Sequence, residues 1–471
     1  MHWRVAALGT AALLAGCALG PDYERPELDI PVGYVQPVAA GESIANLQWW
    51  EVFKDPQLNA LITIALEENQ DLRIATARIE EFRGLLGITR ADQFPQVDIA
   101  GAGGRSDPSE NAFPGNIPGL GGNINENYSL SADVSFVIDL FGRLRRSTEA
   151  ARAQLLAIEE NQRAVTISLI SSVATAYMTL RDLDQQLVIA RRTEATRARS
   201  VEIIQARFDK GTVARIDLNQ AEIQLKIATA TVASAERAVA QTENLLAVLI
   251  GRKPGPIARG AELKAQVLPP AIPTGLPSEL LQRRPDVRAA EAELAAQTAL
   301  IGVAEAIRWP SLSLTGSLGL ESQDLSDLTE GGSDFWSVGV GLLAPIYNAG
   351  RNRSRVDVET ARTQQALLGY EASVLRAFRE VEDALIAIRT YRDEFKARQE
   401  QVTAARSAAT LSRARYNGGV TSYLEVLETD RSLFNAELVE SQTLRLYFSS
   451  IIELYAALGG GWVYEEEEPQ P

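Results

Sequence analysis

Histidine, cysteine and methionine are scarce in this 471-residue chain, which has one histidine, one cysteine and two methionines. His2 lies at the very start, and Cys17, as the single thiol, can form no disulfide within the chain. So little histidine removes the commonest general base of enzymes and the commonest neutral metal ligand. A methionine relay for soft metals is not expected either, because one of the two methionines is Met1. We therefore expect no catalytic residue, no metal site and no cofactor, and a protein that is not an enzyme.

Positive charge is also limited, with 46 Lys and Arg against 61 Asp and Glu and a formal net charge of −15. An acidic chain argues against nucleic acid or anionic lipid headgroups as the main partner. With 46% hydrophobic and 23% charged residues, the chain is nevertheless typical of a globular protein. Its length exceeds that of one ordinary domain.

The first 16 residues have the pattern of a secretory signal peptide. Arg4 is followed by a short apolar run, residues 5–14, which is too short to span a bilayer as a stable helix. The tetrapeptide Leu-Ala-Gly-Cys that ends at Cys17 resembles the bacterial lipobox, in which the cysteine is lipidated and becomes the first residue. Lipid chains contribute roughly 0.8 kcal/mol per buried CH₂, so two or three chains anchor a protein firmly. We predict a lipid on Cys17, the alternative being an ordinary signal peptide with an incidental cysteine.

The residue after the predicted cleavage site bears on the destination of the lipoprotein. Ala18, and not aspartate, follows Cys17. By resemblance to enteric lipoproteins, this favours the outer membrane over the inner membrane.

The second half of the chain repeats the order of glycine and proline residues of the first half. Matching residues lie 208 to 215 positions apart, and glycine and proline keep the same order in both halves. Chance similarity between alanine-rich helices would not reproduce this order, so we infer an internal two-fold repeat. Each half is expected to form a helix, a strand pair, a very long helix, a turn and a second long helix. The matched pairs are Asp71/Asp286, Pro95/Pro310, Gly142/Gly350, Gly211/Gly419 and Gly251/Gly459.

Very long stretches lack glycine and proline, the two residues that interrupt helices. Residues 144–209 contain neither, and residues 351–417 contain only Gly369. The first stretch could form roughly 100 Å of helix at about 1.5 Å per residue. Residues 220–250 and 420–458 also lack both residue types. These lengths exceed the globular norm and indicate coiled-coil or tubular packing.

Four short segments change from helical periodicity to alternation of apolar and polar residues. Residues 311–320 place leucine or glycine at even positions and serine, threonine or glycine at odd ones, and residues 128–140 and 336–342 alternate similarly. A weaker fourth case begins at Val97 and Ile99. Such alternation gives a strand one apolar and one polar face. A soluble sandwich shows the same pattern, but here the strands form two hairpins between very long helices.

The hairpins have features of a transmembrane barrel. Their tips, residues 106–127 and 321–334, are rich in glycine, asparagine and serine, and Tyr128, Phe335 and Trp336 stand at strand starts, as in interfacial girdles. Four strands cannot close a barrel, and membrane barrels need at least about eight. Open edges in hydrocarbon would leave backbone groups unpaired. Several copies must therefore contribute, and the pattern leaves open two copies with eight strands or three with twelve.

Five segments carry a specific resemblance that covers almost the whole chain. They are LLAGCALGPDYERP near the start, WWEVFKDPQLNALI at 49–62, RRPDVRAAEAELAAQ at 283–297, ARYNGGVTSYLEVLETDRSLFNAEL at 414–438 and LYAALGGGW at the end. They are similar to segments of TolC-family outer-membrane factors, most of all the lipidated OprM/NodT-type members. The resemblance implies a homotrimeric twelve-stranded barrel, with four strands per protomer, continued by a long α-helical tunnel through the periplasm of a Gram-negative bacterium.

The resemblance also implies a function and partners. Members of the family dock onto a periplasmic adaptor (membrane fusion) protein, which links them to an inner-membrane transporter, usually proton-driven. We therefore expect a passive outer-membrane duct for drugs or other small solutes, gated at the periplasmic helix tips. Type I protein secretion and heavy-metal efflux are the alternatives within the family. A cytoplasmic coiled-coil scaffold and a carboxylate-only periplasmic hydrolase are rivals outside it, and the leader and the hairpins argue against the first.

These features predict a division of the chain into consecutive parts. The predicted parts are a signal peptide (1–16), a lipidated N-terminal and equatorial segment (17–60), a first repeat (61–251) with its hairpin at about 95–141, a proline-rich linker and equatorial segment (252–285), a second repeat (286–459) with its hairpin at about 310–346, and a C-terminal tail (460–471).

The resemblance places a gate at two helix-turn-helix tips, 206–220 and 414–428. Gly211 and Gly419 are expected to make the turns. Leu424 and Glu428 match positions that form constricting rings in OprM-like proteins. Trimerisation would turn each carboxylate into a ring of three, which selects cations and repels itself when closed.

The remaining tip residues are expected to form a latch or to meet the adaptor. Tyr416 and Arg431 match residues that tie the inner helix pair to its neighbour, with Asp217 as the expected acceptor and Glu425 as a further carboxylate. Thr421 stands where TolC itself carries a latch arginine, so the latch must rely on Arg431 or be weaker. The turns, with the arginines that precede them, are expected to contact the adaptor. Those arginines are Arg207 and Arg415.

Overall fold

The computed structural model describes residues 18–36, 49–107, 124–267 and 277–460. The predicted signal peptide, Cys17 and nearly all of the predicted tail lie outside these residues. The chain divides into two compact units, each built from three separate segments. The sheet unit comprises Met1–Pro26, Ile79–Ile158 and Ala290–Tyr370, and the helical unit comprises Glu27–Arg78, Glu159–Ala289 and Glu371–Pro471.

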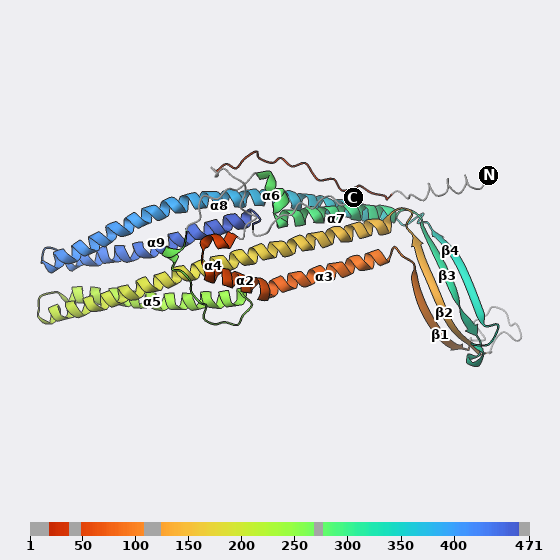
Figure 1. Ribbon diagram of the computed structural model, residues 1–471, viewed down its shortest axis with the longest axis horizontal. Coiled ribbons are helices and arrows are strands. Elements are labelled where there is room, and N and C mark those ends of the chain that lie inside the picture. Colours follow the sequence, from red (N-terminus) through yellow and green to blue (C-terminus); the bar gives the residue numbers. More distant parts are fainter. Residues whose placement is uncertain (1–17, 37–48, 108–123, 268–276, 461–471) are drawn as a thin grey trace. The chain divides into compact units, whose positions relative to one another are not determined.

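The sheet unit contains one four-stranded antiparallel sheet in the order β1-β2-β3-β4 (Figure 1). The two predicted hairpins are therefore both present, and they pair with each other through β2 and β3. The strands are β1 Gln96–Ser106, β2 Asn125–Ile138, β3 Ser311–Ser322 and β4 Asp334–Leu343.

The register confirms that the strands have one apolar and one polar face. Ile99, Ala132, Leu318 and Trp336 lie in one row across all four strands. Three of them are large and exposed, at 81% for Ile99, 65% for Leu318 and 75% for Trp336, so this face lacks cover within one chain. Such a face is suited to the hydrocarbon of a membrane, where exposed apolar side chains carry no free-energy cost.

The opposite face is polar and bonded within itself. Asp133 accepts hydrogen bonds from the hydroxyl groups of Ser131, at 2.8 Å, and Ser317, at 2.6 Å. These three side chains come from neighbouring strands β2 and β3. The polar face therefore has the character of a wetted interior surface.

Phe335 differs from the girdle that the sequence predicts. The register pairs Phe335 with Gly319 on the polar face, whereas Trp336 and Tyr128 lie on the apolar face. A Cβ atom at Gly319 would lie 3.0 Å from the Phe335 ring and 2.3 Å from the carbonyl oxygen of Leu130. The missing side chain leaves room for the aromatic ring, so Phe335 covers backbone and does not contribute to a girdle.

The helices repeat in length as well as in order. The two longest have 67 residues each, their partners have 35 each, and the helices before the strands have 22 each. The predicted uninterrupted helices are confirmed, including the one that contains Gly369. They are α3 Gln70–Ala91, α4 Arg143–Asp209, α5 Arg215–Leu249, α7 Pro285–Ala306, α8 Arg351–Asn417 and α9 Tyr423–Ala457, with the shorter α2 Pro56–Glu68 and α6 Pro277–Arg283 and the 3₁₀ turns η2 Trp49–Phe53, η4 Leu263–Ala265 and η5 Leu325–Asp327.

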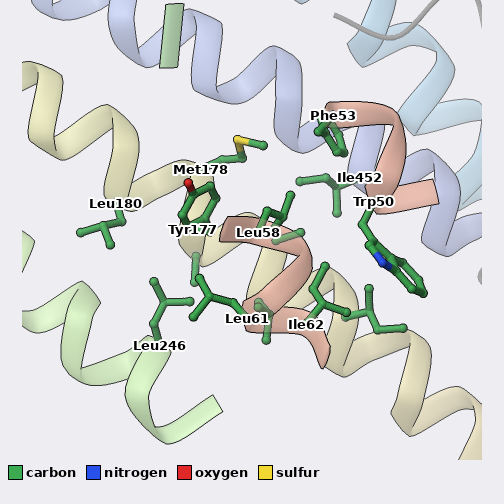
Figure 2. Close-up of a cluster of buried hydrophobic side chains, with 14 of the residues drawn as sticks. Trp50, Phe53, Leu58, Leu61, Ile62, Tyr177, Met178, Leu180, Leu246 and Ile452 are labelled. Atoms are coloured by element: carbon green, nitrogen blue, oxygen red, sulfur yellow. The ribbon is translucent and has the colours of Figure 1, made fainter. Parts of the chain in front are cut away.

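The core of the helical unit forms where α2 packs against α4, α5 and α9. Figure 2 shows Leu58 and Ile62 of α2 beside Tyr177 of α4, Leu246 of α5 and Ile452 of α9. All five are at most 3% exposed. This burial holds the helix pairs of both repeats together in one unit, from which the turns between α4 and α5 and between α8 and α9 extend.

Candidate gate at the helix tips

Two glycine turns of the same geometry end α4 and α8. Gly211 has φ 70° and Gly419 has φ 71°, in the left-handed region that glycine tolerates. The N–H of Thr212 donates to the carbonyl of Arg207 at 3.0 Å, and Val420 makes the equivalent bond in the second turn at 2.9 Å. This bond closes a Schellman cap. No atom lies within 4 Å of a Cβ built at either glycine, so backbone conformation and not crowding requires glycine.

An aromatic joint links the two tips within one chain. The guanidinium of Arg207 lies 4.9 Å from the ring centre of Tyr416, and the rings of Tyr416 and Tyr423 are 5.4 Å apart. Tyr423 also belongs to a buried apolar cluster with Ile204 of α4 and Leu218 of α5. Burial, with the nearby negative charge of Asp430, raises the pKa of Tyr423 to about 12. The tips are thus packed together and not independent.

The hydroxyl group of Tyr416 lacks a hydrogen bond within the part of the chain that the structure describes. Its hydroxyl oxygen is buried and has no hydrogen-bond partner among the described residues. The ring contacts the guanidinium of Arg207 and the ring of Tyr423, whereas the hydroxyl group makes no hydrogen bond there. A partner from outside one chain would therefore find an available donor and acceptor here.

The tip carboxylates pair with cations of the same hairpin. Glu425 accepts a hydrogen bond from the Thr421 hydroxyl and lies 3.6 Å from the Arg415 guanidinium. Glu428 pairs with Arg431 at 2.7 Å, one turn along α9, with both side chains more than half exposed. Exposed pairs of this kind add little stability and exchange partners readily.

The expected contact between Asp217 and Arg431 is not made within one chain. Asp217 lies half-buried in the first turn of α5 and has no side-chain partner among the described residues, while Arg431 pairs with Glu428. The pair between Arg431 and Glu428 follows from helix spacing, because residues three apart on a helix are neighbours. A latch between Asp217 and Arg431 would have to form between different copies of the chain.

Leu424 and Glu428 share one face of α9, four residues apart, as the expected ring positions require. Leu424 is 60% exposed although it is a large apolar residue. Its side chain is therefore accessible at the tip, on the same face of α9 as the carboxylate of Glu428.

Behind the tip lies an arginine–carboxylate network that the sequence did not reveal. Glu437 of α9 is nearly buried and accepts from Arg192 of α4 and, at 3.0 Å, from Arg406 of α8. Asp430 and Arg413 pair at 2.8 Å beside it. The network lines a cavity of about 240 Å³. Its members are single charges on polar helix faces, and their partners are too far apart in sequence for a motif to reveal them.

Comparison with known proteins identifies the chain's relatives. The outer membrane efflux protein family matches residues 61–252 and 276–460. The chain is 37% identical over 461 residues to the solvent efflux pump outer membrane protein SrpC of Pseudomonas putida, covering 96% of both chains. It is 36% identical over 460 residues to the cation efflux system protein CusC of Escherichia coli O157:H7, covering 96% of this chain and 97% of that one.

Solved structures agree with the sequence relatives. The open state of the MtrE outer membrane channel of Neisseria gonorrhoeae matches with a TM-score of 0.84 and 33% identity, covering 94% of this chain and 98% of that one. The expected fold is confirmed, and the number of copies that the strand pattern left open is three. The chain belongs to the outer membrane efflux protein family, whose trimeric channels join a β-barrel in the Gram-negative outer membrane to an α-helical tunnel in the periplasm.

Proposed function

We propose that the channel passively conducts drugs or other small solutes that a proton-driven inner-membrane transporter delivers through a periplasmic adaptor. The gate lies at the tips of the helical unit, where three copies of Leu424 and Glu428 surround the axis. The observation that supports this proposal is the exposure of Leu424 one turn before Glu428, on a tip that a left-handed Gly419 closes. An apolar ring excludes water, and a carboxylate ring repels itself and favours cations.

Opening of this gate would separate contacts that are exposed to solvent, and exposed ion pairs contribute little stability. The pairs Glu428–Arg431 and Glu425–Arg415 are exposed, and the Tyr416 hydroxyl has no partner within the described chain. Asp217 and Arg431 of adjacent copies would complete the latch in the closed state. The adaptor would bind at the glycine turns, near Arg207 and Arg415, and shift the balance towards the open state by binding it more tightly.

Heavy-metal efflux is the alternative that one observation favours, because CusC, a cation efflux protein, is among the relatives. Cargo contact through thioether groups does not fit this chain. Met178 of α4, the methionine outside the predicted leader, is fully buried in the apolar core of the helical unit. Small-solute efflux therefore remains the proposed function, and a metal cargo would have to pass without soft ligands from methionine.

We further propose that the mature chain begins at a lipidated Cys17 and that the predicted domain boundaries hold. A mass spectrum of the purified mature protein tests the anchor. A mass that includes diacylglycerol on residue 17 supports it, and an unmodified cysteine or a different first residue contradicts it.

The gate is tested by removing both ring side chains. Leu424→Ala with Glu428→Ala should raise the single-channel conductance in planar bilayers several-fold, because a steric and an electrostatic constriction disappear together. The control variant is Leu411→Ala with Glu400→Ala, which removes an exposed leucine and an exposed glutamate of α8 outside the turn. Equal conductance of both variants and the unmodified channel would refute the assignment of Leu424 and Glu428.

A further inference from the structure

Both 67-residue helices begin with arginines directly after the sheet. Helix α4 starts with Arg143 and has a further arginine at position 145, and α8 starts with Arg351, followed by Arg353. These positions correspond in the two repeats, since each pair is 208 residues apart. Neither helix has an acidic residue in its first turn. The arrangement therefore occurs twice in the same place.

The physics of helices disfavours this choice of residue. The first turn carries the positive end of the helix dipole, where acidic side chains stabilise and basic ones destabilise. Other helices have the acidic residue that this dipole favours in their first turn, such as Asp71 in α3 and Asp286 in α7. Arg143 and Arg351 therefore stand at helix starts where the helix dipole gives them no stabilisation.

Arg145 has a partner close by, because its guanidinium lies 3.5 Å from the carboxylate of Asp139, but four other arginines at these helix starts have no side-chain partner within the described residues. Arg143, Arg351, Arg353 and Arg355 are exposed, and their side chains form no hydrogen bond or ion pair there. Arg146, between them in sequence, is different, because it is buried and held by Asp22 at 2.6 Å and Glu149 at 2.8 Å. The exposed set thus does not hold the fold together.

Aromatic side chains surround the same end of the sheet. Phe141 and Trp309 stack at 5.2 Å and, with Arg143, line a cavity of about 350 Å³. Trp309 is 51% exposed, and Tyr347, in the segment between β4 and α8, is 89% exposed. Tryptophan and tyrosine beside basic residues mark the boundary between membrane and water.

We propose that Arg143, Arg351, Arg353 and Arg355 form an arginine girdle that binds the phosphate groups of anionic phospholipids in the periplasmic leaflet of the outer membrane. The planar guanidinium suits phosphate, with which it forms two parallel hydrogen bonds. The acyl chains would then cover the apolar face of the sheet, which begins beside the girdle at Leu342. This position at the end of the strands favours a lipid over a nucleic acid or a protein as the partner.

The net charge of −15 does not oppose this inference. Charges farther apart than about 8 Å are screened at physiological ionic strength, so local charge decides binding at a surface. The acidic balance of the chain argues against anionic lipid as a partner of the surface as a whole, but a local cluster of arginines can still bind it. The inference depends on the barrel and is independent of the proposed gate.

The test measures lipid binding to the intact trimer. Native mass spectrometry of the detergent-purified trimer, titrated with phosphatidylglycerol or phosphatidylethanolamine, should show tighter binding of phosphatidylglycerol. Arg143→Gln with Arg351→Gln should weaken that binding by roughly fivefold per arginine removed. Arg143→Lys with Arg351→Lys should restore a large part of it, because the charge is kept. The matched control, Arg199→Gln with Arg389→Gln, removes two exposed arginines that lack side-chain partners among the described residues of the helical unit and should leave lipid binding unchanged.

Several results would overturn the proposal. Equal binding of the two lipids to the unmodified trimer would do so, and this comparison needs no variant to fold. An equal loss in the girdle variant and the control, or no loss in either, would also contradict it. Inorganic phosphate that displaced the lipid at equal concentration would show a free-anion site in place of a lipid girdle.

Discussion

Asp55 shows how one buried polar residue can organise the helical unit. Its carboxylate is fully buried and caps α2 by accepting from the N–H of Gln57 at 2.9 Å. It also accepts from the hydroxyl of Tyr177 at 2.7 Å and from the amide of Gln266 at 2.6 Å. Burial alone would raise the pKa of Asp55, but the bonds from Gln266, Tyr177 and the backbone outweigh it and lower the pKa. Asp55 therefore joins α2, α4 and the linker after α5.

Replacing Asp55 by asparagine should lower the stability of the folded protein by about 1–3 kcal/mol at neutral pH, because an amide cannot accept all of these bonds. A lowered pKa contributes stability above the ordinary carboxyl value, and this contribution is lost as the pH falls through the folded-state pKa. The difference in melting temperature between the Asp55→Asn variant and the unmodified protein should thus shrink below about pH 4.

Thermal unfolding followed by circular dichroism in detergent measures this difference. Asp107→Asn serves as the control, since Asp107 is exposed at the end of β1. A difference that stays constant from pH 7 to pH 3 would show that the charge of Asp55 is irrelevant.

At the scale of elements, glycine plays opposite roles inside helix α8 and in the turn that follows the helix. Gly419 adopts φ 71° in the tip turn, whereas Gly369 lies inside the regular helix α8. No atom lies within 4 Å of a Cβ built at either position. Only the backbone conformation therefore distinguishes the two glycines.

Alanine at these two positions should change stability in opposite directions. Gly419→Ala forces an L-residue into the left-handed region and should cost about 1–2 kcal/mol, whereas Gly369→Ala should stabilise the helix by about 0.5–1 kcal/mol. Melting temperatures of the two variants, measured side by side, check the signs. Two shifts of the same sign would mean that packing between copies, and not backbone conformation, governs these glycines.

The helices and turns of the tip could be predicted from the sequence, but the ion pairs between their side chains could not. The helices and turns follow from the spacing of glycine, proline and good helix formers, which are local properties. The pairing of Arg431 with Glu428, and of Glu437 with Arg192 and Arg406, depends on which helix faces meet. Several charged residues at helical spacing are compatible with more than one set of pairs.

At the scale of the whole molecule, the four-stranded sheet of one chain cannot form a closed barrel by itself. Strands β1 and β4 are the edges of the sheet, and no strand among the described residues pairs with the outer side of either one. In hydrocarbon, unpaired edges cost several kcal/mol per backbone group, so barrel closure by other copies is required. The trimeric channels of the family provide that closure.

A charge on the apolar face should therefore prevent assembly, while the same charge on the polar face should not. Val338→Arg, on the exposed apolar face, should cost about 2–4 kcal/mol in each copy and reduce the recovery of trimer from the outer membrane. Ser337→Arg, its neighbour on the polar face, is the matched control. Trimer recovery, measured by membrane fractionation and size-exclusion chromatography, should fall for Val338→Arg alone. Equal recovery of both variants would contradict the assignment of the two faces.

The repeat, the long helices and the two-faced strands were all readable from the order of residues, because each is a periodic property of consecutive positions. Only the folded chain shows the faces on which Phe335, Asp133 and Arg431 lie and the bonds to Asp55. It alone also shows that Arg143 and Arg351 are exposed and lack side-chain partners among the described residues. These features depend on contacts, or on the absence of contacts, between residues that lie far apart in sequence. Periodicity says which side of an element is polar, but packing alone decides which polar groups meet.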